Sequence, residues 1–229
     1  ALVVATLTAC GNAKNDVPTH SNVGDNNYTQ STHDTTNNQN SHANMNHSAM
    51  AMDNQNTAPH TQAYLAMMGA MGDKMSVAGS LADPDVAFVS GMIPHHIGAV
   101  EMAKVQLEFG KDETMRKLAQ AIIDGQQAEI DLMNGWLNGK DTTTQNANAP
   151  HAKAYAAGKA QHEAMMAAIN EPNPDVAFAK AMIPHHQGAV EMAKVQLQFG
   201  KDEKMKKLAQ DIIKAQEPEI KLMQDWLKQ

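Results

Sequence analysis

Two adjacent histidines follow a proline in the segment MIPHHIGAVEMA, and the same arrangement returns 90 residues later in MIPHHQGAVEMA. The pairs are His95 with His96 and His185 with His186. Imidazole nitrogen binds copper, zinc, iron and nickel, whereas thioether sulfur prefers soft ions such as Cu(I). Because a methionine precedes each pair by about one helical turn, these residues predict a soft-metal site in each copy.

Each histidine pair is predicted to lie on one face of a long helix, at about 100° per residue. A second methionine follows each pair at the edge of that face. The candidate metal ligands on the two helices are Met92, His95, His96 and Met102 in the first copy, and Met182, His185, His186 and Met192 in the second. A methionine stripe more commonly fills a core than binds a metal, but here it coincides twice with a histidine pair.

The helix before each histidine helix carries further candidates. In the second copy, His162 precedes Met165 and Met166 by three and four residues, which places all three on one helical face. The first copy has Tyr64 where His162 would align, so its site is expected to depend on thioethers. Those thioether candidates are Met67, Met68 and Met71.

Polar residues interrupt the apolar stripe of the helix that follows each histidine helix. They are Gln126 and Glu129 in the first copy, and Gln216 and Glu219 in the second. A carboxylate in an apolar line needs a partner, and an imidazole from the neighbouring helix is a natural one. We expect the two glutamates to orient the histidine rings, supported by the glutamines; the alternative is that they ligate a harder metal.

The elements that must position these residues are helical throughout, and the fold class is predicted to be all-α. Each copy is expected to contain three helices, so the chain holds two tandem repeats at 60–138 and 151–229, joined by a linker at 139–150. The expected helices are about 61–81, 84–109 and 113–137, then 151–169, 174–199 and 203–228. Side chains suited to N-caps precede the second and third helix of each repeat, at Asp83, Asp112, Asn173 and Asp202.

Pro94 and Pro184 lie inside the two expected histidine helices. Proline removes a backbone hydrogen bond, here to the carbonyl of Ser90 or Lys180, and so permits a kink that re-aims the following imidazoles. The alternative is a helix that simply begins at the proline.

The N-terminal stretch ALVVATLTACG resembles the end of a bacterial lipoprotein signal, in which a short apolar box precedes a cysteine. The resemblance implies that residues 1–9 are removed and that Cys10 is lipidated, which would anchor the protein to the outer or the cytoplasmic membrane. A leftover apolar N-terminus with a free cysteine is the alternative. Residues 10–59 are polar and predict a disordered tether, whose His/Met tract either captures metal weakly or is a chance feature of a linker.

Composition excludes several classes of protein. The net charge of −7 disfavours a nucleic-acid partner, and a single cysteine allows no internal disulfide. The sequence contains no nucleophile elbow and no phosphate loop, so an enzyme of these kinds is not expected. A ferritin-like di-metal oxidoreductase is an alternative, but the main helices lack its Glu-x-x-His motif.

The motifs MIPHHxGAVEMA and QxxEIxLMxxWL resemble those of the CopM-like family of periplasmic copper-binding proteins, a bacterial domain-of-unknown-function family. The resemblance covers residues 60–229 as two tandem copies. It implies a ferritin-like helical bundle, a periplasmic or cell-surface location, and methionine and histidine ligands at the positions named above. The departure at Tyr64 puts one ligand of the first copy in doubt.

The sequence and the resemblance together predict a non-enzymatic, lipid-anchored protein that sequesters Cu(I) and contributes to metal tolerance. Cu(II) and Ag(I) are further candidate ions, and an unidentified protein is a candidate delivery partner. The remaining alternative is a helical interaction module whose histidines are core residues with satisfied hydrogen bonds.

Overall fold

The computed structural model describes residues 57–155 and 159–229, without the side chains of residues 67–76 and 159–162. This part of the chain is helical, which confirms the all-α prediction. Its one extended contact is an isolated antiparallel bridge between Leu81 and Gln145. The proposed tether and Cys10 lie outside the described residues.

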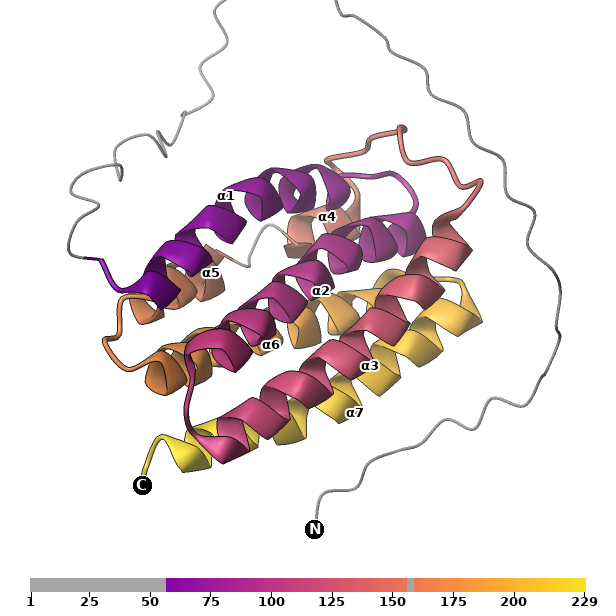
Figure 1. Cartoon of the computed structure of the whole chain (residues 1–229). Helices are drawn as coiled ribbons and strands as arrows, with labels where there is room; N and C mark the ends of the chain where they lie inside the picture. Colours follow the sequence, from indigo (N-terminus) through magenta and orange to yellow (C-terminus); the bar gives the residue numbers. More distant parts are fainter. Residues whose placement is uncertain (1–56, 156–158) are drawn as a thin grey trace, which may run out of the picture. The chain divides into compact units, whose positions relative to one another are not determined.

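Seven helices follow one another in the described residues (Figure 1). They are α1 (Pro59–Ala78), α2 (Pro84–Phe109), α3 (Glu113–Leu137), α4 (Pro150–Tyr155), α5 (Lys159–Ala168), α6 (Pro174–Phe199) and α7 (Glu203–Trp226). The two histidine helices, α2 and α6, have the predicted bounds. The single helix expected at 151–169 is wrong, because two shorter helices, α4 and α5, take its place.

The predicted N-caps explain where the long helices begin. The side chain of Asp83 accepts hydrogen bonds from the backbone N–H groups of Asp85 and Val86, and Asn173 does the same at the start of α6. Pro84 and Pro174 then occupy the first helical positions, where no backbone donor is needed. Asp112 and Asp202 cap α3 and α7 in the same way.

Both histidine helices continue through their internal prolines. Helix α2 includes Pro94 and helix α6 includes Pro184, so the alternative of a helix that begins at the proline is wrong. An internal proline costs about 3 kcal/mol in an isolated helix. Burial of the surrounding apolar side chains, such as Phe88 and Phe178 at 0% exposure, offsets that cost.

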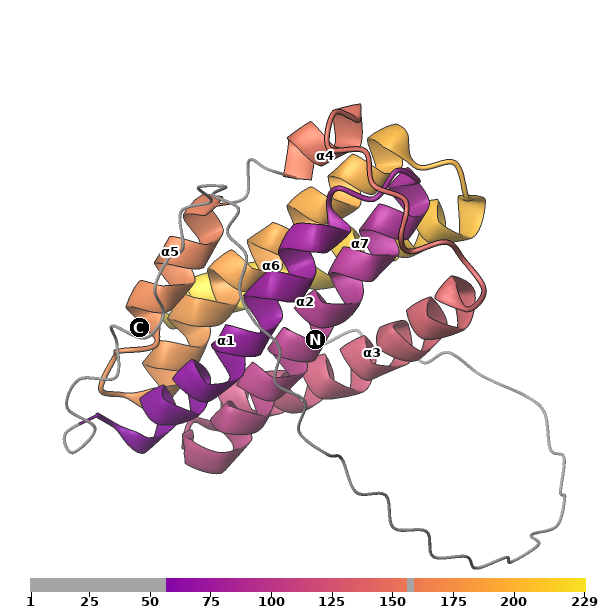
Figure 2. The same cartoon turned by 90° about the horizontal axis from the view of Figure 1, so that it is seen from above.

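Helices α2 and α6 run antiparallel at the centre of the helical unit (Figures 1 and 2). The start of α2 meets the end of α6, where Asp85 contacts Gln196, and the start of α6 meets the end of α2, where Asp175 contacts Gln106. Helix α3 packs on α2 and α7 on α6, while α1 covers α2 and α5 covers α6. The two segments predicted as repeats, 60–138 and 151–229, therefore meet through their histidine helices.

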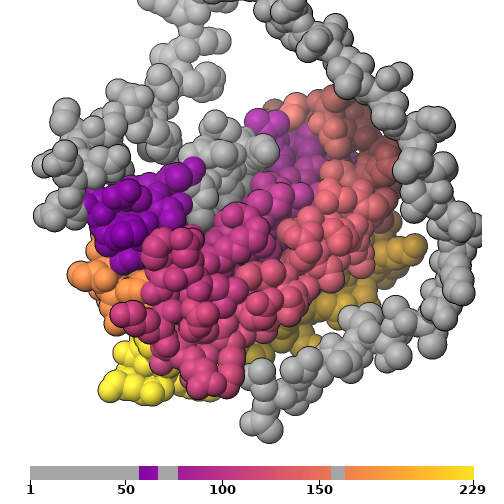
Figure 3. All heavy atoms as spheres, in the orientation of Figure 1, coloured from indigo at the N-terminus to yellow at the C-terminus, as the bar shows by residue number. Residues whose placement is uncertain are grey.

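The two main clusters of buried apolar residues each draw on both repeats. One contains Met102 and Met115 together with Phe178 and Met182. The other contains Phe88 and Met92 together with Ala189, Met205 and Ile212. The space-filling view shows α2 and α3 in close contact along one face (Figure 3). No described helix is long and apolar enough to cross a bilayer.

Candidate metal centre

His96 and Glu129 connect α2 to α3. The Nε2 atom of His96 lies 2.7 Å from an Oε atom of Glu129, and the histidine is fully buried. The glutamate side chain is 22% exposed, so one end of this pair reaches water. This is the contact that the polar position in the α3 stripe predicted, and the role of Glu129 beside a metal stays a prediction.

The second repeat reproduces this pair. His186 Nε2 lies 2.7 Å from Glu219 on α7, with the histidine fully buried and the glutamate 23% exposed. The supporting glutamines Gln126 and Gln216 are also buried, and the Oε1 atom of each has no hydrogen-bond partner. These amides sit one helical turn before the glutamates and are polar groups that the protein leaves unsatisfied.

The other two histidines meet across the repeats. The ring centroids of His95 and His185 are 3.9 Å apart, with the rings tilted by 44°. Both side chains are buried, at 5% and 3% exposure. Within each repeat, the adjacent rings are farther apart, at 6.5 Å for His95 and His96 and 6.4 Å for His185 and His186. The structure therefore brings the two predicted histidine pairs together in one buried group.

This burial keeps the central imidazoles neutral. The pKa of His95 is lowered to about 3, mainly by desolvation and to a smaller extent by repulsion from the neighbouring His96 and His186. Desolvation, followed by repulsion from His95, also holds the pKa of His185 well below its ordinary value. The imidazoles are therefore in the neutral form, which is the form that can bind a metal ion.

Several ring nitrogens in this group have no partner. The Nδ1 atoms of His95, His96, His185 and His186 are all buried and unpartnered, and so is Nε2 of His185. A buried polar atom without a hydrogen bond costs about 1–3 kcal/mol. A metal ion that bound these nitrogens through their lone pairs would recover part of that free energy.

The described methionine candidates are buried or partly buried. Met92, Met102 and Met182 are fully buried in the two apolar clusters, Met165 is 4% exposed, and Met166 and Met192 are partly buried. A Cβ atom placed on Gly91 would lie 3.1 Å from the terminal methyl of Met192, so this side chain reaches from α6 to α2. The side chains of Met67, Met68, Met71 and His162 lie outside the described residues.

The described residues contain no group of three or more His, Cys, Asp or Glu side chains arranged to hold a metal ion. The observed centre consists of paired imidazoles, two of which are held by glutamates.

A second repeated motif escaped the sequence analysis. His60 and Tyr64 on α1 correspond to His151 and Tyr155 on α4, in the segments HTQAY and HAKAY. His60 Nε2 lies 2.8 Å from the carbonyl oxygen of Glu171, and His151 Nε2 lies 2.8 Å from that of Leu81. Each histidine thus joins its own repeat to the other one.

The tyrosines of this motif also occupy matching environments. Both hydroxyls are buried without a hydrogen-bond partner. Burial is the larger cause that raises the pKa of each hydroxyl. The negative charge of an aspartate in the opposite repeat raises it further, from Asp175 for Tyr64 and from Asp85 for Tyr155. The expected equivalence of Tyr64 with His162 is therefore wrong, because Tyr155 is the counterpart of Tyr64. The repeated His-x-x-Ala-Tyr spacing is the signal that could have shown it.

Asp85 and Asp175 hold the two ends of the α2–α6 contact. Asp85 accepts hydrogen bonds from Gln196 Nε2 at 2.5 Å and from the backbone N–H groups of Lys201 and Asp202. Asp175 makes the matching bonds with Gln106 Nε2 at 2.6 Å and with the N–H groups of Lys111 and Asp112, the residues before α3. Asp85 therefore holds the turn before α7, and Asp175 holds the turn before α3.

These bonds explain the glycines at the ends of α2 and α6. Gly110 and Gly200 are the C-caps of α2 and α6, but their φ angles of −73° and −65° are not left-handed. A Cβ atom on either one would overlap the side chain of Gln106 or Gln196. The glycines are needed because the glutamines fold across them to reach the aspartates.

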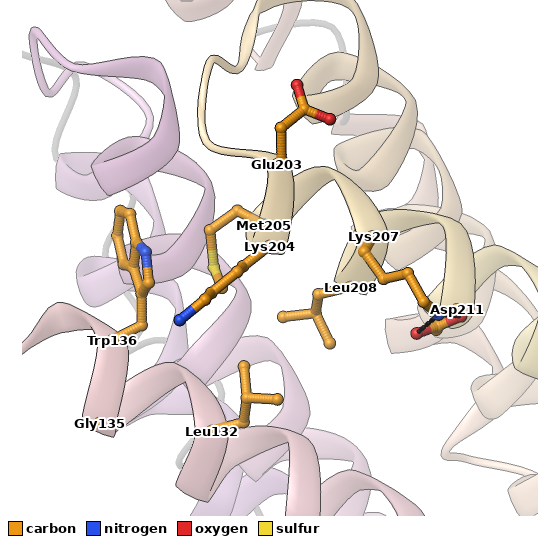
Figure 4. A pocket seen from close by; sticks show the side chains of 9 residues that line it. All are labelled: Leu132, Gly135, Trp136, Glu203, Lys204, Met205, Lys207, Leu208 and Asp211. Atoms are coloured by element: carbon orange, nitrogen blue, oxygen red, sulfur yellow. Dashed lines mark hydrogen bonds and ion pairs between the residues drawn. The ribbon is translucent and has the colours of Figure 1, made fainter.

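A surface hollow of the described residues lies elsewhere, between α3 and α7 (Figure 4). It has a volume of about 710 Å³ and is open to solvent on one side. Leu132 and Trp136 line one wall, and Met205, Lys204 and Leu208 line the other. None of the predicted metal ligands borders it.

Comparison with known proteins places the chain in a family. Residues 85–227 match the sequence profile described as Domain of unknown function (DUF305). CopM in its Cu(I)-bound form is 31% identical over 63% of this chain and 95% of its own, with a TM-score of 0.49. A DUF305 protein from Streptomyces coelicolor is 28% identical over 64% of this chain and 91% of its own, with a TM-score of 0.53.

CopM has also been solved with silver and with Cu(II) bound. An uncharacterized protein of Acanthamoeba polyphaga mimivirus is 43% identical over 54 residues, which span 24% of this chain and 36% of that relative. The helical architecture agrees with the Streptomyces structure, and the family profile covers both histidine helices and both glutamate helices. The chain belongs to the DUF305 family.

Proposed function

We propose that this protein binds and sequesters copper through imidazole and thioether groups of its two helical repeats. The observation that carries the proposal is the buried group of four histidines, in which every Nδ1 atom lacks a partner. A set of unsatisfied, neutral imidazoles is unfavourable in an empty core and favourable around a cation.

The chemistry of the surroundings favours a soft ion. Met92 and Met182 lie one helical turn before the histidine pairs and are fully buried. Thioethers and neutral imidazoles carry no charge, so a bound monovalent ion leaves only one buried charge. Cu(I) is the ion that we propose, and Cu(II) and Ag(I) are further ions that the protein would bind. The related CopM has been solved with copper and with silver bound.

Glu129 and Glu219 support this role by holding His96 and His186. A carboxylate that hydrogen-bonds one ring nitrogen orients the ring and makes the other nitrogen a better ligand. Here the bonded atom is Nε2 in both residues, which leaves Nδ1 for a metal. The protein binds its ion without turning over a substrate.

The proposed cellular setting rests on the sequence. Lipidation of Cys10 would keep the protein in the periplasm or at the cell surface. There it would contribute to copper tolerance by capturing free copper ions. A delivery protein is a candidate partner, and nucleic acid is not.

An anaerobic Cu(I) titration of the full chain against a competing chelator tests the proposal. Wild type is compared with His95→Ala/His96→Ala and with His185→Ala/His186→Ala. Each double variant should bind less copper, and Cu(I) should raise the Tm of wild type because it binds the native state. Equal copper uptake by all three proteins would show that the histidines are core residues of an interaction module.

A further inference from the structure

We propose that the surface through which the segments 60–138 and 151–229 pair is self-complementary, so that each segment also fits a second copy of itself. In an isologous two-fold interface, both partners contribute the same patch of residues. The partner that this surface fits is therefore a second copy of this chain. The inference concerns the packing of the two segments and does not depend on metal binding.

The hydrogen bonds at the two ends of the α2–α6 contact follow a two-fold pattern. Asp85 of the first segment binds Gln196 and the turn before α7, and Asp175 of the second segment binds Gln106 and the turn before α3. The two aspartates correspond at an offset of 90 residues, and so do the two glutamines. All four side chains are buried, with at most 6% exposure. Each segment therefore carries both an aspartate and the groups that bind an aspartate.

The histidine bonds of α1 and α4 follow the same pattern. His60 Nε2 of the first segment lies 2.8 Å from the carbonyl oxygen of Glu171, and His151 Nε2 of the second lies 2.8 Å from that of Leu81. Leu81 and Glu171 also correspond at an offset of 90 residues. Their side chains differ, but the acceptor is a backbone carbonyl that both provide. In a pair of first segments, each His60 would meet the Leu81 carbonyl of its partner.

The two main apolar clusters contain equivalent parts with the segments exchanged. One holds a phenylalanine and a methionine of α6 with a methionine and an alanine of α3, and the other holds the same types from α2 and α7. These residues, all at 0% exposure, are Phe178, Met182, Met115 and Ala119 in one cluster and Phe88, Met92, Met205 and Ala209 in the other. Because each segment supplies both kinds of part, two first segments contain the residues for two complete clusters.

The linker favours pairing inside one chain. It holds the two segments at a high effective concentration, so pairing within the chain outcompetes pairing with a second copy. Cutting the linker removes this advantage and leaves the choice of partner to the surfaces alone. Residues 140–148 are exposed, so the linker can accept a protease recognition sequence.

A full chain with a protease recognition sequence inserted after Lys140 tests the inference. The folded protein is cleaved, unfolded in urea and refolded without metal, so that slow dissociation cannot hide an exchange of partners. Native mass spectrometry then separates the mixed pair from the two like pairs by mass. Both like pairs should appear in amounts comparable to the mixed pair.

Recovery of the mixed pair alone would overturn the inference, because the surfaces would then discriminate between the two segments. Recovery of unpaired segments alone would overturn it too, because the surfaces would then not suffice for pairing. The uncut chain with the same insertion, refolded at low concentration, is the control and should return as a monomer. None of these results bears on copper binding, so the proposed function is tested separately.

Asp85→Asn should affect the three pairs unequally. The pair of first segments contains two Asp85 contacts, the mixed pair one and the pair of second segments none. The substitution should weaken the mixed pair about 10-fold and the pair of first segments about 100-fold, with the pair of second segments unchanged. Asp124→Asn is the matched control, since Asp124 is exposed and bonds Gln120 within α3. Equal weakening of all three pairs by Asp85→Asn would contradict the two-fold contact.

Discussion

The hydrogen bonds that His96 and His186 donate to Glu129 and Glu219 connect the buried imidazoles to partly exposed carboxylates. Both glutamates are partly exposed, whereas both histidines are fully buried. A glutamate in this position fixes the ring and its tautomer, and so controls which nitrogen faces inward.

Glu129→Gln and Glu219→Gln should each weaken copper binding by about 10-fold, because the loss of an orienting carboxylate typically costs about 10–100-fold in affinity. Chelator competition measures the change. Glu101→Gln is the matched control, since Glu101 is a half-buried glutamate whose carboxylate pairs with Lys104. A weaker affinity in the control than in the two variants would contradict the assigned role.

Two glycine substitutions separate the close approach of His95 from general helix stability. Gly125 is exposed in α3 with nothing near its position, so Gly125→Ala should stabilise the protein by about 0.5–1 kcal/mol. Gly188→Ala should lose this gain, because the new Cβ lies 3.2 Å from His95 Nε2, and should also weaken copper binding. Urea unfolding and copper competition measure both effects; an equal gain in both variants with unchanged affinity would show that the ring moves freely.

At the scale of helices, the termini decide how the repeats are joined. Asp85 and Asp175 stand in the first turns of α2 and α6, where acidic residues are favourable in any helix. Here each also accepts hydrogen bonds from the turn before α7 or α3 of the opposite repeat. The same residue therefore stabilises its own helix and the packing of the two repeats.

Asp85→Asn should destabilise the protein by about 2–3 kcal/mol. The donors that now bond two carboxylate oxygens would have only one amide oxygen. Hydrogen bonds to charged groups are worth about 1.5–3 kcal/mol. The free energy of unfolding in urea measures the change. Asp211→Asn is the control, since Asp211 is exposed and binds only Lys207. A loss below 0.5 kcal/mol, roughly the scatter of surface substitutions, would mean that the contact contributes little.

For the whole molecule, the buried histidines make stability depend on pH. His95 and His185 have lowered pKa values in the folded protein, so below about pH 6.5 the unfolded chain binds protons that the native state does not. Their contribution to stability is complete above that pH and is lost as the pH falls. Between pH 6.5 and pH 5 the two imidazoles should together lower the free energy of unfolding by about 4 kcal/mol, because each contributes about 1.4 kcal/mol per pH unit.

Urea unfolding from pH 5 to pH 7.5 without metal checks this dependence. The double variant His95→Gln/His185→Gln should show a much shallower slope over the same range, since glutamine does not titrate. A wild-type slope equal to that of the variant would show that the rings are protonated in the native state. Copper binding by these two imidazoles should change little between pH 7 and pH 5, because they stay neutral in the native state.

The sequence by itself determined the helices and their ends. N-cap side chains, helix-initiating prolines and the 3.6-residue apolar period are local features, so α2, α3, α6 and α7 begin where those residues predict. The contacts of the two glutamates with histidine could also be predicted, because an isolated carboxylate in an apolar stripe needs a partner. The split of the helix predicted at 151–169 was missed, since no periodic signal marks it.

Only the tertiary structure decided that the two histidine pairs meet. Each repeat read alone suggests its own site, because spacing within a helix says nothing about which helix packs opposite. The antiparallel register of α2 and α6 is set by Asp85 and Asp175 reaching into the other repeat, over more than 60 residues of sequence. Those long-range hydrogen bonds place His95 against His185, and no pattern within a single segment could reveal it.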